Sequence, residues 1–161
     1  MKTFSTILIL LFTVALSVPV FAQASASQVL TLEVKVINKI AVTGNPQPLV
    51  ISDIPAGTES ATVSDYSTMY DVTTNMENMK IVASINNPLP SGMQLMVDLG
   101  SQQGSTAGLV DVSSATTPVN VVTGIQRGSD ASQTIGYVFK TYATAGTMPS
   151  DSRTVTLTIS E

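Results

Sequence analysis

The amino-acid sequence predicts an all-β protein of eight or nine antiparallel strands. Apolar residues alternate with polar ones along several segments, as they do along strands with one buried face. Turn-forming Gly, Pro, Asn and Asp recur at intervals of roughly eight to twelve residues, a spacing typical of β-sandwiches. Ser, Thr, Val and Ala are abundant and no segment has a convincing helical period, which suits pleated sheets on which β-branched side chains pack well.

An export signal is expected before the strands, over residues 1–22. A positively charged start precedes an apolar run at residues 7–16, which is the pattern of a signal peptide. This run is too short to cross a hydrocarbon core, which needs roughly 20 residues. We therefore expect residues 23–161 to form one mature domain that is secreted and not inserted in a membrane. The sequence allows two later first residues, Ala24 and Ala26.

The first strand is expected over residues 28–43, where the alternation is longest. Apolar side chains share one parity there: Leu30, Leu32, Val34, Val36, Ile40 and Val42. Ordinary strands are about five or six residues long. The segment is therefore expected to be one unusually long strand or two strands joined by a bend near Asn38.

The rest of the chain alternates between strand signals and turn signals. Turns or loops are expected at residues 44–48, 54–57, 87–92, 127–130 and 145–152, because Gly, Pro, Asn and Asp collect there. Residues 100–108 are rich in Gly, Ser and Gln and are expected to form a mobile, dispensable loop. The remaining strands are expected near residues 49–51, 61–63, 68–74, 79–86, 93–99, 119–125, 133–144 and 154–160.

These elements predict an antiparallel, immunoglobulin-like β-sandwich over residues 23–161, with Greek-key connections. A closed barrel is the alternative. A chain of this length buries about two thirds of its unfolded surface. It can therefore hold a core although it has no cysteine to form a disulfide.

The residue types present argue against an enzyme. The chain has no histidine and no cysteine, which excludes Ser-His-Asp and Cys-His catalysis and the usual zinc, haem and iron–sulfur ligands. We expect no cofactor and no catalytic residue. A glycosidase-like carboxylate pair would have to come from Asp65, Asp71, Asp98 and Asp111. A Ser–Lys dyad would have to use Lys35, Lys39, Lys80 or Lys140. Both sets are interpreted as surface groups of turns and strands.

The sequence offers candidate calcium ligands without a calcium-binding motif, and it argues against nucleic acids as partners. Loop carboxylates could bind calcium, and the candidates are Asp53, Glu59, Asp65, Asp130 and Asp151. No EF-hand spacing is present, so turn-forming roles are preferred for them. The net charge is −4 and the charged residues are scattered along the chain. This argues against binding to nucleic acid and to anionic membrane surfaces. Tyr137 lies mid-strand between Ile135 and Phe139 and is expected in the core.

Both ends of the mature chain resemble a known class of proteins. Residues 28–42 and the closing segment 154–160 resemble the corresponding regions of bacterial fimbrial, pilin-like subunits that polymerise by donor-strand exchange. In those subunits an alternating N-terminal extension completes the sandwich of the neighbouring subunit. The chain departs from many chaperone–usher pilins because it has no disulfide and no aromatic residue just before its C-terminus.

The resemblance implies a homopolymer built by β-augmentation, with a second copy of the chain as partner. Its candidate strand-donation face is Leu30, Leu32, Val34 and Val36. The function expected is a non-catalytic structural or adhesive protein of the cell surface, of the pilus or fimbria kind. The alternative is a monomeric secreted β-sandwich that binds a ligand. Either protein would be periplasmic, extracellular or at the cell surface.

Overall fold

The computed structural model describes residues 24–161. The export signal expected over residues 1–22 lies outside the described residues. The chain divides into two units, Met1–Glu33 and Val34–Glu161. In the first unit, residues 24–33 contain no helix or strand. Every strand that the structure describes belongs to the second unit.

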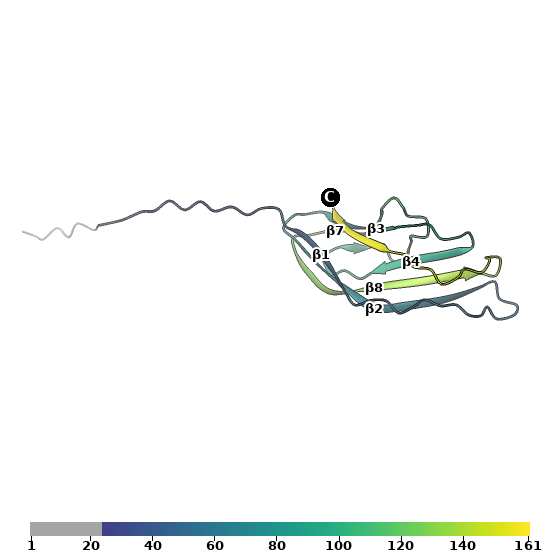
Figure 1. Cartoon of the computed structure of the whole chain (residues 1–161). Coiled ribbons are helices and arrows are strands. Elements are labelled where there is room, and N and C mark those ends of the chain that lie inside the picture. The colour runs from purple at the N-terminus through teal and green to yellow at the C-terminus, as the bar shows by residue number, and fades with distance from the viewer. Residues whose placement is uncertain (1–23) are drawn as a thin grey trace, which may run out of the picture. The chain divides into compact units, whose positions relative to one another are not determined.

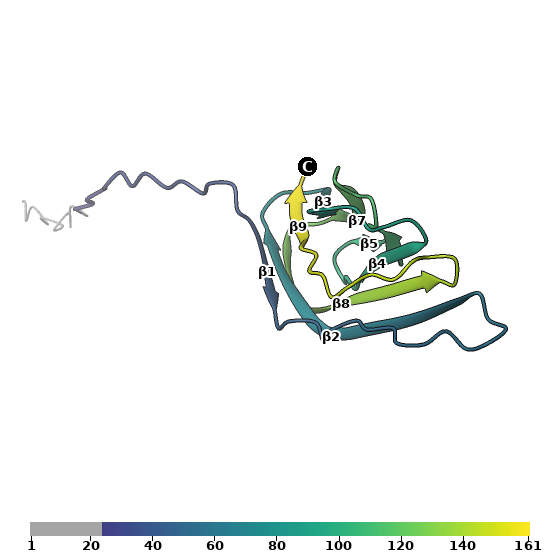
Figure 2. The same cartoon turned by 45° about the vertical axis from the view of Figure 1, so that its right-hand side comes forward.

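Nine strands make up the second unit. They are β1 (Asn38–Thr43), β2 (Ser60–Thr74), β3 (Met79–Ile85), β4 (Met93–Leu99), β5 (Ser105–Thr106), β6 (Val110–Asp111), β7 (Val119–Ile125), β8 (Gly128–Tyr142) and β9 (Val155–Ser160). The first sheet has the order β1-β2-β8-β4-β6 and the second the order β5-β7-β3-β9, with antiparallel pairing throughout. Figures 1 and 2 show the two sheets as separate layers. The prediction of an all-β, two-sheet antiparallel fold is confirmed.

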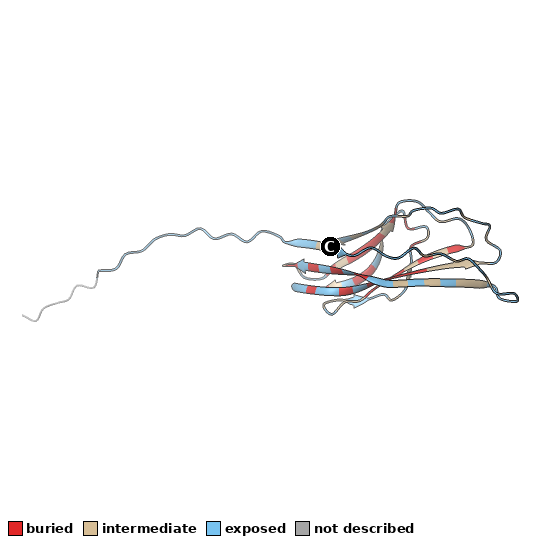
Figure 3. Ribbon diagram, turned by 60° about the horizontal axis from the view of Figure 1, so that its bottom comes forward, coloured by how far each residue is buried: buried red, intermediate tan, exposed pale blue. Residues whose placement is uncertain are grey.

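The core lies between the sheets, as the alternation predicts. In β4, buried residues alternate strictly with partly buried ones, and Figure 3 shows similar banding along other strands. Tyr70, Ile81, Val97 and Ile135 are among the side chains that are fully enclosed. Within residues 24–161 the structure contains no helix long and apolar enough to cross a membrane.

The prediction of a strand over residues 28–43 is wrong in its first part. Only Asn38–Thr43 of this segment is a strand, and residues 28–37 belong to no strand pair in the part of the chain that the structure describes. The bend expected near Asn38 coincides with the start of β1. The strand expected at 49–51 is also absent. Pro46 and Pro48 precede it and cannot donate ladder hydrogen bonds.

Two other predicted boundaries change because the central strands are longer than expected. Residues 61–63 and 68–74 belong to one strand, β2, which is interrupted by a bulge between Asp65 and Thr68. There the Asp65 carboxylate accepts hydrogen bonds from the backbone N–H and the hydroxyl of Ser67, so a short local turn accompanies the bulge. Strand β8 begins at Gly128, inside the turn expected at residues 127–130.

The loop expected at residues 100–108 contains a short strand, β5, and is anchored by hydrogen bonds. One oxygen of the buried Asp130 carboxylate accepts hydrogen bonds from the Ser101 hydroxyl (2.8 Å) and from the backbone N–H groups of Gln102 (2.8 Å) and Gln103 (3.2 Å). Strand β5 then pairs with β7. A methyl group added at Gly104 would come within 2.7 Å of Val122. The segment is therefore packed onto the second sheet.

Candidate assembly surface

The proposed donation face consists of four exposed side chains. Leu30, Leu32, Val34 and Val36 are 75%, 89%, 82% and 66% exposed. Residues 24–37 carry no helix or strand, so the structure does not organise these side chains into a face. Scattered apolar side chains are ordinary on protein surfaces, but an alternating row of four gains free energy if a partner buries it.

Asn75 fixes the chain just before β1 begins. Its side-chain oxygen accepts a hydrogen bond from the backbone N–H of Ile37 (2.8 Å), and its side-chain NH₂ donates to the carbonyl of Lys35 (2.8 Å). The backbone N–H of Asn75 also donates to the carbonyl of Ile37 (3.1 Å). We call these three bonds the Asn75 clamp. They hold residues 35–37 beside the end of β2.

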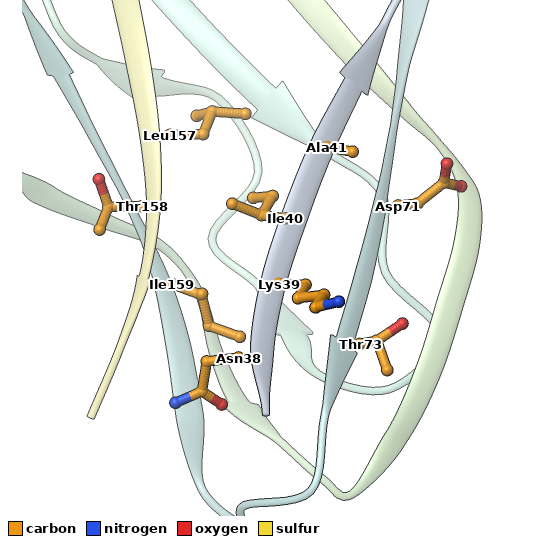
Figure 4. A pocket seen from close by; sticks show the side chains of 9 residues that line it. All are labelled: Asn38, Lys39, Ile40, Ala41, Asp71, Thr73, Leu157, Thr158 and Ile159. Atoms are coloured by element: carbon orange, nitrogen blue, oxygen red, sulfur yellow. The ribbon is translucent and has the colours of Figure 1, made fainter. Parts of the chain in front are cut away.

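A groove separates the edge strands β1 and β9, and we call it the seam. It has a volume of about 560 Å³ and is lined by Asn38, Lys39, Ile40, Ala41, Asp71, Thr73, Leu157, Thr158 and Ile159. Figure 4 shows Ile40, Leu157 and Ile159 directed into the space between the two strands, which run in opposite directions.

The seam lies where neither sheet has a further strand. Among the strands of residues 24–161, β1 is hydrogen-bonded only to β2, and β9 only to β3. Ile40, Leu157 and Ile159 pack against the core but are only partly buried. The backbone edges of β1 and β9 are therefore unpaired beside incompletely covered apolar side chains.

The opposite side of the sandwich is closed by residues 112–115. Val112 is fully buried and its N–H donates to the carbonyl of Leu95 on β4. The carbonyl of Ala115 accepts from the N–H of Ile85 on β3. The same short segment thus bonds to both sheets, on the side of the sandwich away from the seam.

A second cleft lies at one end of the sandwich, with a volume of about 590 Å³. Residues 48–54 and 145–151 form its walls, and Met93 and Phe139 also line it. Two of the calcium candidates, Asp53 and Asp151, are at this cleft. Asp151 forms an ion pair with Arg153, and the hydrogen bond from that guanidinium is the main cause that lowers its pKa.

The other carboxylates considered from the sequence are spread over the fold. The Asp111 carboxylate accepts from the backbone N–H of Ser113 (2.8 Å) and the Asp71 carboxylate from that of Ser132 (2.7 Å). Asp98 lies on β4 and is partly buried, and Glu59 just before β2 is exposed. In residues 24–161 no three acidic side chains gather as metal ligands would.

The four lysines considered for a dyad lie on different elements. Lys39 is exposed on β1, and Lys80 is partly buried on β3. The ammonium of Lys140 lies 4.4 Å from the centre of the Tyr142 ring, a cation–π contact. Lys35 lies in the segment held by the Asn75 clamp.

Two tyrosines, Tyr70 and Tyr137, are buried in the core. Tyr137 is 9% exposed, so its predicted core position is confirmed. Burial, followed by the charge of Asp65, raises its pKa. The Tyr70 hydroxyl donates to the carbonyl of Gly100 (2.6 Å). Burial, with a contribution from Asp130, raises the pKa of Tyr70 to about 12.

Sequence reasoning identified the apolar row but not the seam or Asn75. Thr alternates with apolar residues along β9, and this pattern predicts a strand. It does not predict that the strand lies at the edge of a sheet. No protein-family model matches the chain, and comparisons with curated proteins and with solved structures find no match either.

Proposed function

We propose that the protein is a secreted, non-catalytic structural or adhesive subunit of the cell surface that assembles by donating residues 28–36 to another copy. The observation that carries this proposal is the alternating row of exposed apolar side chains at Leu30, Leu32, Val34 and Val36. The proposal includes an export signal over residues 1–22 and an immunoglobulin-like connection of the strands.

The energy available from this row supports an assembly role. Burying one Leu or Val side chain is worth about 1.5–3 kcal/mol, so four supply up to about 6–12 kcal/mol, an upper bound because unfolded chains already bury some surface. A donated strand adds backbone hydrogen bonds to a free sheet edge. The total is comparable with the net stability of a whole domain, so assembly through this row would be durable.

The test is a pair of variants with matched charge changes. Leu32→Asp with Val34→Asp removes two apolar side chains and adds two negative charges. Thr31→Asp with Lys35→Gln makes the same net change on the other parity of the segment. We expect the mature wild type and the control to form multimers on size-exclusion chromatography and fibres by negative-stain electron microscopy. The Leu32/Val34 variant should be monomeric.

The melting temperature of the monomeric Leu32/Val34 variant completes the test. All four substituted positions are exposed within the chain, so the monomeric variant should keep a strand-type circular dichroism spectrum and a cooperative transition. A wild type that stays monomeric at high concentration would contradict the proposal. It would favour the alternative, a monomeric binding module, for which the cleft at Met93 and Phe139 offers a site.

A further inference from the structure

We propose that the seam between β1 and β9 accepts residues 28–36 of a second copy, and that the Asn75 clamp prevents a chain from filling its own seam. This inference rests on the proposed function. It adds the accepting surface and the reason why donor and acceptor belong to different copies.

The pattern of the donor segment matches the pattern of the seam. Along β9, Val155, Leu157 and Ile159 are partly buried on the core side, while the intervening Thr residues are exposed. A strand paired with the free edge of β9 would place one parity toward the core and the other toward solvent. Residues 28–36 supply Leu and Val on one parity and mainly Thr, Glu and Lys on the other.

The lengths also agree. Nine extended residues span about 30 Å and the six residues of β9 about 20 Å, at about 3.3 Å per residue. The donor segment is thus long enough to cover the whole free edge of β9. The apolar side chains of the donor would then cover Ile40, Leu157 and Ile159, which are only partly buried within a single chain.

The charged residues at the seam lie to one side of the space that the donor would enter. Lys39 and Asp71 border the seam, and Figure 4 shows them on the side of β1 away from β9. The charged residues of the donor, Glu33 and Lys35, belong to its polar parity and would face solvent.

The other two free edges are poorer acceptors. Strands β5 and β6 have two residues each, so a donated strand would gain few backbone hydrogen bonds there. Residues 112–115 already cover the core on that side by bonding to both sheets. The seam therefore offers the longer edge and the less complete apolar cover.

The Asn75 clamp disfavours insertion of a chain into its own seam. To lie beside its own β1, the segment would have to reverse direction around Ile37 and Asn38. Two-residue hairpin loops need positive φ angles that favour Gly, and a β-branched Ile adopts them only with strain. The reversal would also break the hydrogen bonds from Asn75 to Lys35 and Ile37.

Disulfide trapping can test the acceptor directly because the chain has no native cysteine. Glu33→Cys lies on the polar parity of the donor, and Thr158→Cys on the exposed parity of β9. The double variant, under mild oxidation, should give a ladder of disulfide-linked multimers on a non-reducing gel. A second double variant with Thr156→Cys covers a register shifted by two residues.

The matched control places the acceptor cysteine at Thr106, which is exposed on β5, the opposite edge of the same sheet. Glu33→Cys with Thr106→Cys should give no ladder. If the cysteine-free protein forms multimers but only the Glu33→Cys, Thr106→Cys variant gives a ladder, the seam is overturned as the acceptor and the proposed function stands. Absence of multimers in the cysteine-free protein would overturn the proposed function itself.

The role of Asn75 is tested in the Glu33→Cys, Thr158→Cys background. Asn75→Ala should shift products from the ladder to monomers that have lost both free thiols, because the released segment can enter its own seam. Asn75→Asp removes the donor to Lys35 but keeps an acceptor for Ile37, so it should give a smaller shift and remains informative if the Ala variant does not fold. An unchanged ladder in folded variants of both kinds would refute the role of the clamp.

Discussion

Removing the carboxylate of Asp130 should destabilise the protein more than removing any exposed carboxylate. Asp130 is 3% exposed, and a single oxygen accepts hydrogen bonds from Ser101, Gln102 and Gln103. Asp130→Ala leaves three donors without their acceptor in a partly buried segment. It also releases the start of the connection that leads into β5.

The size of the effect follows from the bonds lost. A hydrogen bond to a charged group is worth about 1.5–3 kcal/mol, and a buried donor left unpaired costs about 1–3 kcal/mol. Because the three donors share one acceptor, and water can replace part of it, we expect a loss of about 3 kcal/mol in the free energy of unfolding. For a domain of this size that corresponds to a fall of about 10 °C in the melting temperature.

The assay is thermal and urea unfolding followed by circular dichroism. Asp65→Ala is the control, because Asp65 is more exposed and bonds only the nearby Ser67, and it should cost under about 1 kcal/mol. Asp130→Asn should recover part of the loss, since its amide oxygen can occupy the same position. A melting temperature for Asp130→Ala within about 2 °C of wild type would refute the anchoring role.

Further predictions concern Tyr70 and Gly136. Because the pKa of Tyr70 is raised to about 12 from 10.0, its contribution to stability is complete below pH 10 and is lost as pH rises toward 12. Alkaline unfolding of wild type should therefore show a loss of about 1–2 kcal/mol that Tyr70→Phe lacks, and equal pH profiles would contradict this. A methyl group at Gly136 would approach the half-exposed ring of Tyr66 to 2.2 Å. Gly136→Ala should cost about 1 kcal/mol in wild type and less in a Tyr66→Ala background, as a double-mutant cycle in urea would measure; equal costs in both would disprove the contact.

The alternation of apolar and polar residues correctly predicted strands that have one buried face and one more exposed face within a single chain. Residues 93–99 form β4 with a strictly alternating burial pattern, because one parity meets the core. Residues 28–37 alternate as clearly but form no strand. Periodicity indicates that a segment would be stable as a half-buried strand. It does not indicate which other strand pairs with that segment.

The candidate site was predictable only in part for the same reason. The row from Leu30 to Val36 is a local pattern and can be found by inspection. The seam depends on which strands become sheet edges, and the roles of Asn75 and Asp130 depend on partners far away in the sequence. Asn and Asp are common in turns, so their residue types gave no sign of these long-range bonds.

The pairing of β2 with β8 has a consequence for how the chain folds. These two strands of 15 residues form the centre of the first sheet, with Ser60 opposite Tyr142 and Thr74 opposite Gly128. The chain between Thr74 and Gly128 must form a long closed loop before these strands can pair, and this costs conformational entropy before any contact is gained. Folds dominated by contacts between distant residues fold in milliseconds to seconds. A chain emerging with its N-terminus first therefore carries β2 without its complete pairing to β8 until Tyr142 has also emerged.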